Sequence, residues 1–200
     1  LVEASDRLFA VTYNYTAYPL VREARALVAA GEIGRVRTVQ VEYAQDWLTE
    51  RLEDTGHKQA AWRTDPARSG AGGAIGDIGT HAFNLAEVIT GGRVAPLNGE
   101  LSSFFEGRAV DDNAQILLRF ASGARGALWA SQVAPGHENG LAIRIYGSKG
   151  AILWRQEDPN RMEVASFGGP TRVWTRAGAT ATAAADVKIV SAFNRTAAGV

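Results

Sequence analysis

Hydrophobic and polar positions follow two different periods along the chain, and the change falls near the middle. Apolar residues recur three or four positions apart between Pro19 and Gly31, which predicts an amphipathic helix there. A second run of this kind begins at His81 and stops at Gly91, and it predicts another helix. Before the first helix, residues 8–18 are aromatic and β-branched, which favours a short buried strand.

The rest of the pattern has a period of two, which is typical of strands. Residues 36–43 alternate in this way, and residues 48–76 form a long polar excursion with little predicted regular structure. The turns ASGA (121–124) and GSKG (147–150) suit tight hairpins, so the strands that they join should be antiparallel. Six later segments predict strands: LNGELSSFFEG, AQILLRFA, RGALWASQV, LAIRIYG, AILWRQ and RMEVASF.

These elements together predict an α+β fold, a large and mostly antiparallel sheet with its helices on one face. The small-residue stretch 176–188 is expected to be a loop. At 200 residues the chain is long enough for one domain of good size.

Composition narrows the classes of partner. The chain is 46% hydrophobic and 21% charged with a formal net charge of zero, which gives no electrostatic reason to expect nucleic acid or an anionic membrane. No apolar run approaches the roughly 18 residues that a membrane helix needs. The absence of cysteine excludes disulfides and a thiolate metal site, and it fits a reducing cytoplasm. We therefore expect a cytoplasmic protein.

The stretch SGAGGAIG, residues 69–76, raises the question of a nucleotide site. Its glycines nearly match the G-x-G-x-x-G fingerprint, but Ile75 stands where the third glycine should be. The fingerprint also needs a strand directly before it, whereas the preceding WRTDPARS has the composition of a loop. We expect these glycines to let the backbone pass close to a ligand or a neighbouring strand, with a phosphate site as the alternative.

Asp77 and His81 lie four positions apart at the start of the second helix, so both side chains share one helical face. Three interpretations remain open on this spacing alone. Asp77 could cap the helix, or the pair could belong to a metal site, although the other histidines, His57 and His137, are distant in sequence. In the third, the pair is a proton relay in which the carboxylate orients the imidazole.

The stretch GGAIGDIGTHAFNLAEVITG resembles the G-G-x-x-x-D-x-G-x-H motif of the GFO/IDH/MocA oxidoreductases, the glucose-fructose oxidoreductase and inositol dehydrogenase family. Three further segments are similar to that family: YNYTAYPLVREARALVAAGEIGRV, AWRTDP and IRIYGSKGAILWRQEDPN. The resemblance covers nearly the whole chain and favours the proton relay over a metal site.

The resemblance implies roles for particular residues. His81 would exchange the proton of a substrate hydroxyl while hydride passes between the same carbon and nicotinamide, and Asp77 would orient His81. Trp62 and Arg63 would lie beside the nicotinamide end of NAD or NADP, the alternative being a buried tryptophan and a solvated arginine. Substrate contacts are implied for Asn14, Tyr15 and His137, against core packing for the tyrosine and a surface turn for the histidine.

The sequence contains no strand–G-x-G-x-x-G–helix unit and no Glu-Lys-Pro tripeptide, both of which belong to the nucleotide domain of the family. We therefore expect residues 1–200 to be the C-terminal substrate and oligomerisation domain of an NAD(P)-dependent sugar or polyol dehydrogenase, inactive without an N-terminal dinucleotide-binding domain. The alternative is a non-catalytic binding or assembly module that uses the sheet for protein contacts.

Assembly is expected in either case, because few helices would have to cover a wide sheet. A homodimer or homotetramer formed through the outer face of the sheet is the predicted result, as the resemblance also implies. Seven apolar side chains are expected to occupy both faces of the sheet: Phe104, Phe105, Leu117, Trp129, Ile143, Ile145 and Trp154.

Overall fold

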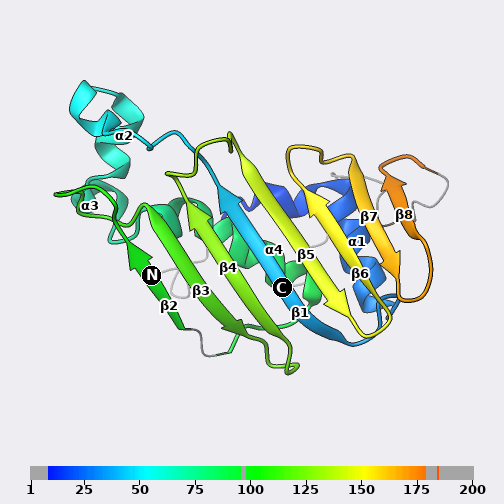
Figure 1. Ribbon diagram of the computed structural model, residues 1–200. Coiled ribbons are helices and arrows are strands. Elements are labelled where there is room, and N and C mark those ends of the chain that lie inside the picture. The colour runs from blue at the N-terminus through cyan, green and yellow to red at the C-terminus, as the bar shows by residue number, and fades with distance from the viewer. Residues whose placement is uncertain (1–8, 96–97, 179–183, 185–200) are drawn as a thin grey trace.

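The computed structural model describes residues 9–95, 98–178 and 184, and it confirms the predicted α+β fold (Figure 1). Among the helices of these residues, none has the length and apolarity that crossing a bilayer requires. In chain order the elements are η1 (Asn14–Ala17), α1 (Pro19–Ala29), β1 (Val36–Ala44), η2 (Leu52–Thr55), α2 (Lys58–Arg63), α3 (Pro66–Ser69), η3 (Ile75–Gly79), α4 (Thr80–Thr90), β2 (Asn98–Ser102), β3 (Asn113–Arg119), β4 (Arg125–Ser131), β5 (Gly140–Gly147), β6 (Gly150–Arg155), β7 (Arg161–Ser166) and β8 (Thr171–Thr175).

Within the described residues the strands form one eight-stranded sheet in the order β2-β3-β4-β1-β5-β6-β7-β8. Neighbouring strands are antiparallel except β1 and β4, which pair in parallel because β1 is inserted between two later strands. The β4–β5 connection therefore crosses the end of β1. There the Gln45 N–H donates to the Ser131 carbonyl at 2.8 Å, and the Ala134 N–H donates to the Gln45 carbonyl at 2.9 Å.

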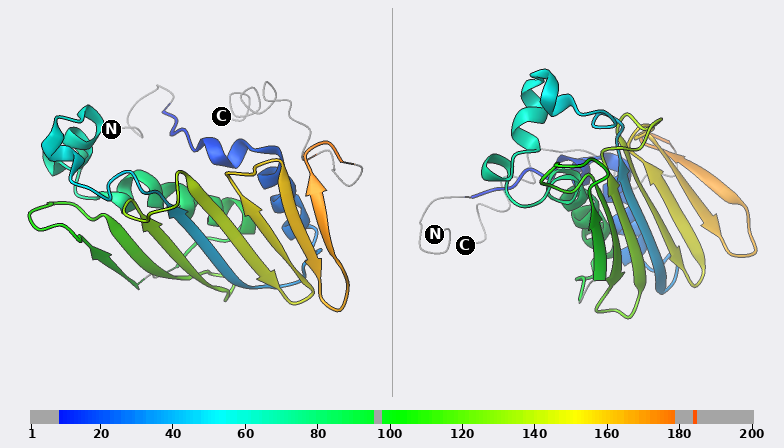
Figure 2. Two further views of the ribbon diagram at one scale, coloured as in Figure 1. Left: turned by 45° about the horizontal axis from the view of Figure 1, so that its top comes forward. Right: turned by 60° about the vertical axis from the view of Figure 1, so that its left-hand side comes forward.

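Helices α1 and α4 cover one face of the sheet, as Figures 1 and 2 show. Most of their apolar residues are buried against the sheet, and Val28, Phe83 and Val88 are partly buried, because both helices repeat apolar residues with helical spacing. The ends are also those that the sequence predicts, with Gly31 and Gly91 in the left-handed conformation at φ 74° and 64°. The residues that form this core layer include Leu20, Val21, Leu27, Leu85, Ile89, Val39, Ile143, Ile145, Ile152 and Trp154.

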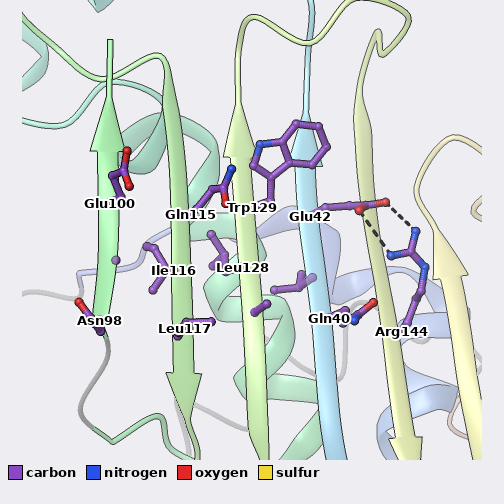
Figure 3. A pocket seen from close by; sticks show the side chains of 13 residues that line it. Gln40, Glu42, Asn98, Glu100, Gln115, Ile116, Leu117, Leu128, Trp129 and Arg144 are labelled. Atoms are coloured by element: carbon purple, nitrogen blue, oxygen red, sulfur yellow. Dashed lines mark hydrogen bonds and ion pairs between the residues drawn. The ribbon is translucent and has the colours of Figure 1, made fainter. Parts of the chain in front are cut away.

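The opposite face of the sheet carries a mixed surface. A hollow of about 570 Å³ lies there on strands β1 to β5, and Figure 3 shows the side chains that line it. Glu42 and Arg144 form an ion pair of 3.0 Å on the neighbouring strands β1 and β5, and Leu117, on β3 of the same face, is 64% exposed. The seven apolar side chains that were expected to occupy both faces of the sheet do not all lie on strands, so that expectation is wrong in part. Ile143, Ile145 and Trp154 are buried, and two of the others, Phe104 and Phe105, follow β2 in a loop.

Three other local predictions are wrong. Residues 9–13 are not a strand and residues 14–17 form the 3-10 turn η1, which the Thr16 hydroxyl helps to close by donating to the Tyr13 carbonyl at 2.7 Å. The excursion 48–76 contains short helices that are not apparent from the apolar spacing. Strand β8 was missed because TRVWT carries few apolar residues and pairs only at the edge of the sheet. Most of the loop predicted at 176–188 lies outside the described residues.

Candidate active site

The glycine-rich stretch turns the chain from the excursion into α4 and contacts the segment that enters β3. The Asp111 carboxylate accepts hydrogen bonds from the backbone N–H groups of Gly73 at 2.7 Å and Ile75 at 2.8 Å. A Cβ on Gly73 would lie 2.0 Å from the Asp111 carbonyl oxygen, so the approach requires glycine. This contact supports the expected close approach of two backbones. The anion that these amides bind is a carboxylate of the protein.

Asp77 and His81 are brought to one pocket by an unusual turn of helix. Residues Ile75–Gly79 form the π-helical turn η3, which continues into α4. Such turns are rare and are frequent at functional sites. Asp77 lies within η3 and His81 lies in the first turn of α4, and both side chains line the same pocket.

The pocket has a volume of about 510 Å³ and lies beyond the end of β1. Most of its lining side chains carry a polar or charged group, and Trp47 and Ile78 add apolar surface. Elements from four parts of the chain contribute to it: the end of β1, the excursion, the η3–α4 junction and the β4–β5 connection. The lining residues are Tyr43, Gln45, Trp47, His57, Gln59, Arg63, Asp77, Ile78, His81 and Glu138.

The Asp77 carboxylate is held by residues distant in sequence. One of its oxygens, Oδ2, accepts a hydrogen bond of 2.8 Å from the Gln132 side-chain amide, and Gln132 is buried at the end of β4. The same oxygen lies 3.0 Å from Arg63 Nε, at ion-pair distance, although the N–H is not directed at it. No side-chain cap bond from Asp77 to the start of either helical segment is present. The capping interpretation is therefore wrong for Asp77, and Asp111 takes that role.

His81 lies in an aromatic surrounding. The rings of Tyr13, Tyr15 and Tyr43 meet its imidazole edge-on, with centroids 5.5, 5.1 and 6.4 Å away. Burial lowers the pKa of His81 below its usual value of 6.5, and the Asp77 charge offsets part of that decrease. The imidazole is therefore neutral at pH 7, the form that accepts a proton. Its Nδ1 is buried and has no hydrogen-bond partner among the described residues.

A chain of hydroxyl and amide groups continues from this aromatic cluster. The Tyr15 and Tyr43 hydroxyls lie 2.6 Å apart, and the Tyr43 hydroxyl donates to Asn139 Oδ1 at 2.6 Å. Gln45 Nε2 donates to the same oxygen at 3.1 Å. Burial, together with Tyr15, raises the pKa of Tyr43, so its hydroxyl keeps its proton.

Several of the site residues were missed by the sequence interpretation. Tyr43, Gln45, Gln132 and Asn139 all lie at strand ends or in the turns beyond them. The only signal in the sequence is that polar residues directly follow strand segments, a position where binding groups often occur.

The structure brings some of the predicted residues together and leaves others apart. Trp62 is half-buried, its indole N–H donates to Gln59 Oε1 at 3.0 Å, and the Arg63 guanidinium lies 4.6 Å from its ring centroid. Asn14 is exposed on η1 and does not line the pocket. His137 packs edge-on against Trp129, 6.3 Å between centroids, while its neighbour Glu138 lines the pocket instead.

Metal ligation has little support from the arrangement. No group of three or more His, Cys, Asp or Glu side chains that could hold a metal ion occurs in the part of the chain that the structure describes. His57 lines the same pocket as His81, but its Nδ1 accepts a hydrogen bond from the Ala60 N–H at 3.3 Å and so caps α2.

The fold and the pocket define a class of protein: an α+β domain that places a neutral histidine, an aspartate and a polar pocket at one end of an open sheet. Residues 21–153 match the family model for the GFO/IDH/MocA C-terminal domain. The chain belongs to this family.

Individual proteins agree with this family assignment. The chain is 32% identical over 181 residues to the uncharacterized oxidoreductase YfiI of Bacillus subtilis, covering 88% of this chain and 45% of that protein. It is 48% identical to an oxidoreductase of Sinorhizobium meliloti, with a TM-score of 0.78, covering 92% of this chain and 47% of that one.

A third similar structure was solved with ligands. It is an inositol dehydrogenase homolog of Azotobacter vinelandii in complex with NADH and myo-inositol, 33% identical, with a TM-score of 0.82 and covering 92% of this chain and 46% of that one. The chain thus spans less than half the length of each of these three proteins.

Proposed function

We propose that this chain is the substrate-side domain of an NAD(P)-dependent oxidoreductase that transfers hydride between a nicotinamide and a carbinol carbon of a sugar or polyol. In this proposal, residues 1–200 follow a dinucleotide-binding domain in a longer polypeptide, and they are inactive without it. The observation that carries the proposal is the half-buried, neutral His81 beside the anchored Asp77 in one pocket. The family and the partial coverage of its members support the division into two domains.

In the oxidation direction, His81 accepts the proton of the substrate hydroxyl. The electron pair of the O–H bond forms the second bond of the carbonyl, and the carbon loses its hydrogen as hydride. The Asp77 carboxylate stabilises the imidazolium that results, which is the same interaction that offsets part of the burial effect in the free protein. Gln132 keeps that carboxylate in place. In the reduction direction, His81 returns the proton.

The nicotinamide, when bound, supplies the acceptor or donor of the hydride. Trp62 and Arg63 are the residues of this chain that would lie beside it, because Arg63 lines the pocket at Asp77 and packs over Trp62. Arg63 Nε makes no hydrogen bond within the described residues but lies 3.0 Å from Asp77 Oδ2, so the Asp77 charge holds the guanidinium at the pocket. The groups present therefore fit the nicotinamide end of NAD or NADP, and the pyrophosphate would be held by the other domain.

Substrate hydroxyls would be bound by the remaining polar groups of the pocket. Tyr15 does not itself line the pocket, but its hydroxyl lies 2.6 Å from that of Tyr43, which does, so Tyr15 would act on a substrate through Tyr43. For Asn14 and His137 the same role would require a ligand that extends beyond the pocket, since neither lines it. We also propose that the outer face of the sheet forms a homodimer or homotetramer interface, because exposed Leu117 and half-buried Trp129 lie in the hollow there.

Replacement of His81 tests the proposal in the full-length protein. His81→Ala should reduce turnover with NAD(P) and a panel of sugars and polyols by about 10²–10⁴, the usual contribution of a positioned acid or base. A matched control is His57→Ala, which changes a histidine in the same pocket that caps a helix; it should retain kcat within about tenfold. Near-normal turnover of His81→Ala between about pH 6 and 9 would contradict the proposal.

A further inference from the structure

Two adjacent aspartates, Asp111 and Asp112, immediately precede β3, and their carboxylates hold different parts of the site. Both residues are buried, with exposed fractions of 8% and 0%. The Asp112 backbone is bonded to residues at the ends of both neighbouring strands. Its N–H donates to the Ser102 carbonyl at 3.0 Å, and its carbonyl accepts from the Gln132 N–H at 2.9 Å. The pair is therefore a rigid point of the sheet from which two loops can be positioned.

Asp111 holds the loop that leads to Asp77 and His81. Its two carboxylate oxygens accept from the N–H groups of Gly73 and Ile75, and its backbone carbonyl accepts from that of Ala74 at 2.8 Å. These amides stand at the start of η3, where helical N–H groups lack partners within the helix. A negative charge there also complements the helix dipole. Because Asp77 follows only two residues after Ile75, Asp111 fixes its position relative to the sheet.

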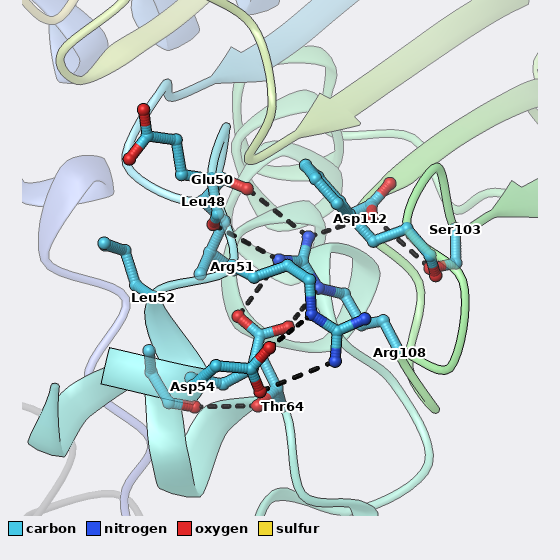
Figure 4. A network of polar contacts seen from close by, with 12 residues as sticks. Leu48, Glu50, Arg51, Leu52, Asp54, Thr64, Ser103, Arg108 and Asp112 are labelled. Carbon is cyan, nitrogen blue, oxygen red and sulfur yellow. Dashed lines mark hydrogen bonds and ion pairs between the residues drawn. The ribbon is translucent and has the colours of Figure 1, made fainter. Parts of the chain in front are cut away.

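Asp112 acts on the excursion through Arg108, as Figure 4 shows. The Arg108 guanidinium is fully buried and donates to Asp112 Oδ2 at 3.0 Å. It also binds both carboxylate oxygens of Glu53 at 2.9 and 3.1 Å and the carbonyls of Leu48 and Glu50 at 3.4 Å. Burial acts to raise the pKa of Glu53, but the hydrogen bonds and charge of Arg108, a backbone hydrogen bond and the charge of Arg51 together lower it.

The excursion, which Arg108 holds through Glu53, provides the side of the pocket opposite Asp77 and His81. Glu53 belongs to η2, and α2 packs on η2 and contains Gln59 and Arg63. The two sides meet where Arg63 Nε lies 3.0 Å from Asp77 Oδ2. The pair that holds the excursion, Arg108–Asp112, is fully buried. A buried ion pair contributes modestly to net stability, but removal of one partner leaves an uncompensated charge. The loss of Asp112 should therefore loosen the excursion in particular.

We propose that Asp111 and Asp112 are positioning residues that set the two sides of the active site independently: Asp111 places Asp77 and His81, and Asp112, through Arg108, places the segment that carries Arg63. The kinetic consequence rests on the proposed function, whereas the anchoring itself does not. Asp111 should affect the chemical step, and Asp112 should affect the binding of the ligands that Arg63 and Gln59 face.

Hydrogen exchange measured by mass spectrometry in the full-length protein tests the anchoring. Asp112→Asn should speed amide exchange in residues 48–63 about 10- to 100-fold, the range expected for loss of a charge-assisted hydrogen bond, and leave residues 73–81 within about twofold. Asp111→Asn should give the reverse pattern. Asp54→Asn, which removes an exposed ion-pair partner in the same segment as Glu53, should change neither.

Steady-state kinetics of the same variants test the positioning roles. Asp111→Asn should lower kcat about tenfold or more with KM values nearly unchanged, and Asp112→Asn should raise a KM about tenfold with a smaller change in kcat. Arg108→Lys keeps the charge but loses the forked geometry, and it should act in the same direction as Asp112→Asn if that variant does not fold. The proposal would be overturned if Asp111→Asn and Asp112→Asn changed kcat and KM to the same extent. It would also be overturned if either variant speeded exchange uniformly over the whole sheet.

The outcomes separate this proposal from the proposed function. Segregated exchange together with normal turnover of His81→Ala would refute the function and leave the anchoring supported. Unsegregated exchange together with an inactive His81→Ala would refute the anchoring and leave the function supported.

Discussion

The chemistry of His81 depends on its neighbours more than on its own identity. Three tyrosine rings surround the imidazole, and the resulting loss of hydration lowers its pKa, because water stabilises the charged form. Asp77 acts in the opposite direction through its charge. A base of this kind is neutral at pH 7 and can still gain a proton in the transition state, which is the requirement for a general base near neutrality.

The acid limb of the pH profile follows from these two effects. Protonated His81 cannot accept the substrate proton, so oxidation should slow as the pH falls through the pKa of His81, below 6.5. Asp77→Asn removes the charge that raises this pKa, so the limb should move to lower pH while the maximal rate falls. The measurement is kcat for alcohol oxidation between about pH 5 and 9.

A control for this measurement is Asp65→Asn, which removes the carboxylate that caps α3 outside the pocket and should leave the limb in place. If Asp77→Asn moves the limb to higher pH or not at all, Asp77 does not act on His81 through its charge.

At the scale of elements, the glycine-rich loop and η3 form a single joint between the excursion and α4. The loop glycines are not equivalent, because only some of them contact other backbone. Gly73 lies against Asp111, whereas a Cβ on Gly76 would meet nothing within 4 Å, and Gly76 has no positive φ. Gly73 therefore allows the loop backbone to lie close to the Asp111 backbone, and its role is not to make the loop flexible.

Alanine substitutions distinguish these two glycines. Gly73→Ala should reduce the free energy of unfolding by about 1–3 kcal/mol, since the methyl group overlaps backbone that cannot move easily. Gly76→Ala should be neutral or stabilise by up to about 1 kcal/mol, because alanine favours the helical state. Urea unfolding followed by circular dichroism measures both. Equal effects at the two positions would show that the contact with Asp111 does not constrain the loop.

At the scale of the whole molecule, the helices of the described residues cover one face of the sheet (Figure 2), and the opposite face carries exposed apolar side chains. Leu117 and Val173, on β3 and β8, are 64% and 48% exposed. Polar groups such as Glu42 and Arg144 lie among them, so this surface is less apolar than the sequence suggested. A mixed surface with a hollow is common at interfaces between subunits.

Self-association through this face is expected for the chain itself. Light scattering at about 50 µM should give the mass of a dimer or tetramer, and Leu117→Lys should shift it toward the monomer because a charge would be buried. Ala29→Lys, at the exposed end of α1 on the opposite side, is the matched control and should not change the mass. A clean monomer at this concentration would refute assembly through the sheet.

Much of the architecture could be predicted because it depends on short-range periodicity. Helices α1 and α4, strand β1 and the two hairpins with ASGA and GSKG follow from the spacing of apolar residues and from glycines at turns. The Asp77–His81 pair was also evident, since the two residues are near one another in the chain. The strand prediction for residues 9–17 was wrong because it rested on their aromatic character, whereas the rings of Tyr13 and Tyr15 pack around His81.

The partners that complete the site were decided only by the tertiary structure. Gln132, Asp111 and Asn139 are each distant in sequence from the residues that they bind, and nothing in the local pattern distinguishes them from other polar residues. The insertion of β1 between β4 and β5 brings them together, because it places the end of β1 beside the β4–β5 connection. The sequence by itself identified Asp77 and His81 as the candidates for the chemistry. The long-range pairing of strands decided their neighbours, because hydrogen bonds and burial depend on distance in space and not along the chain.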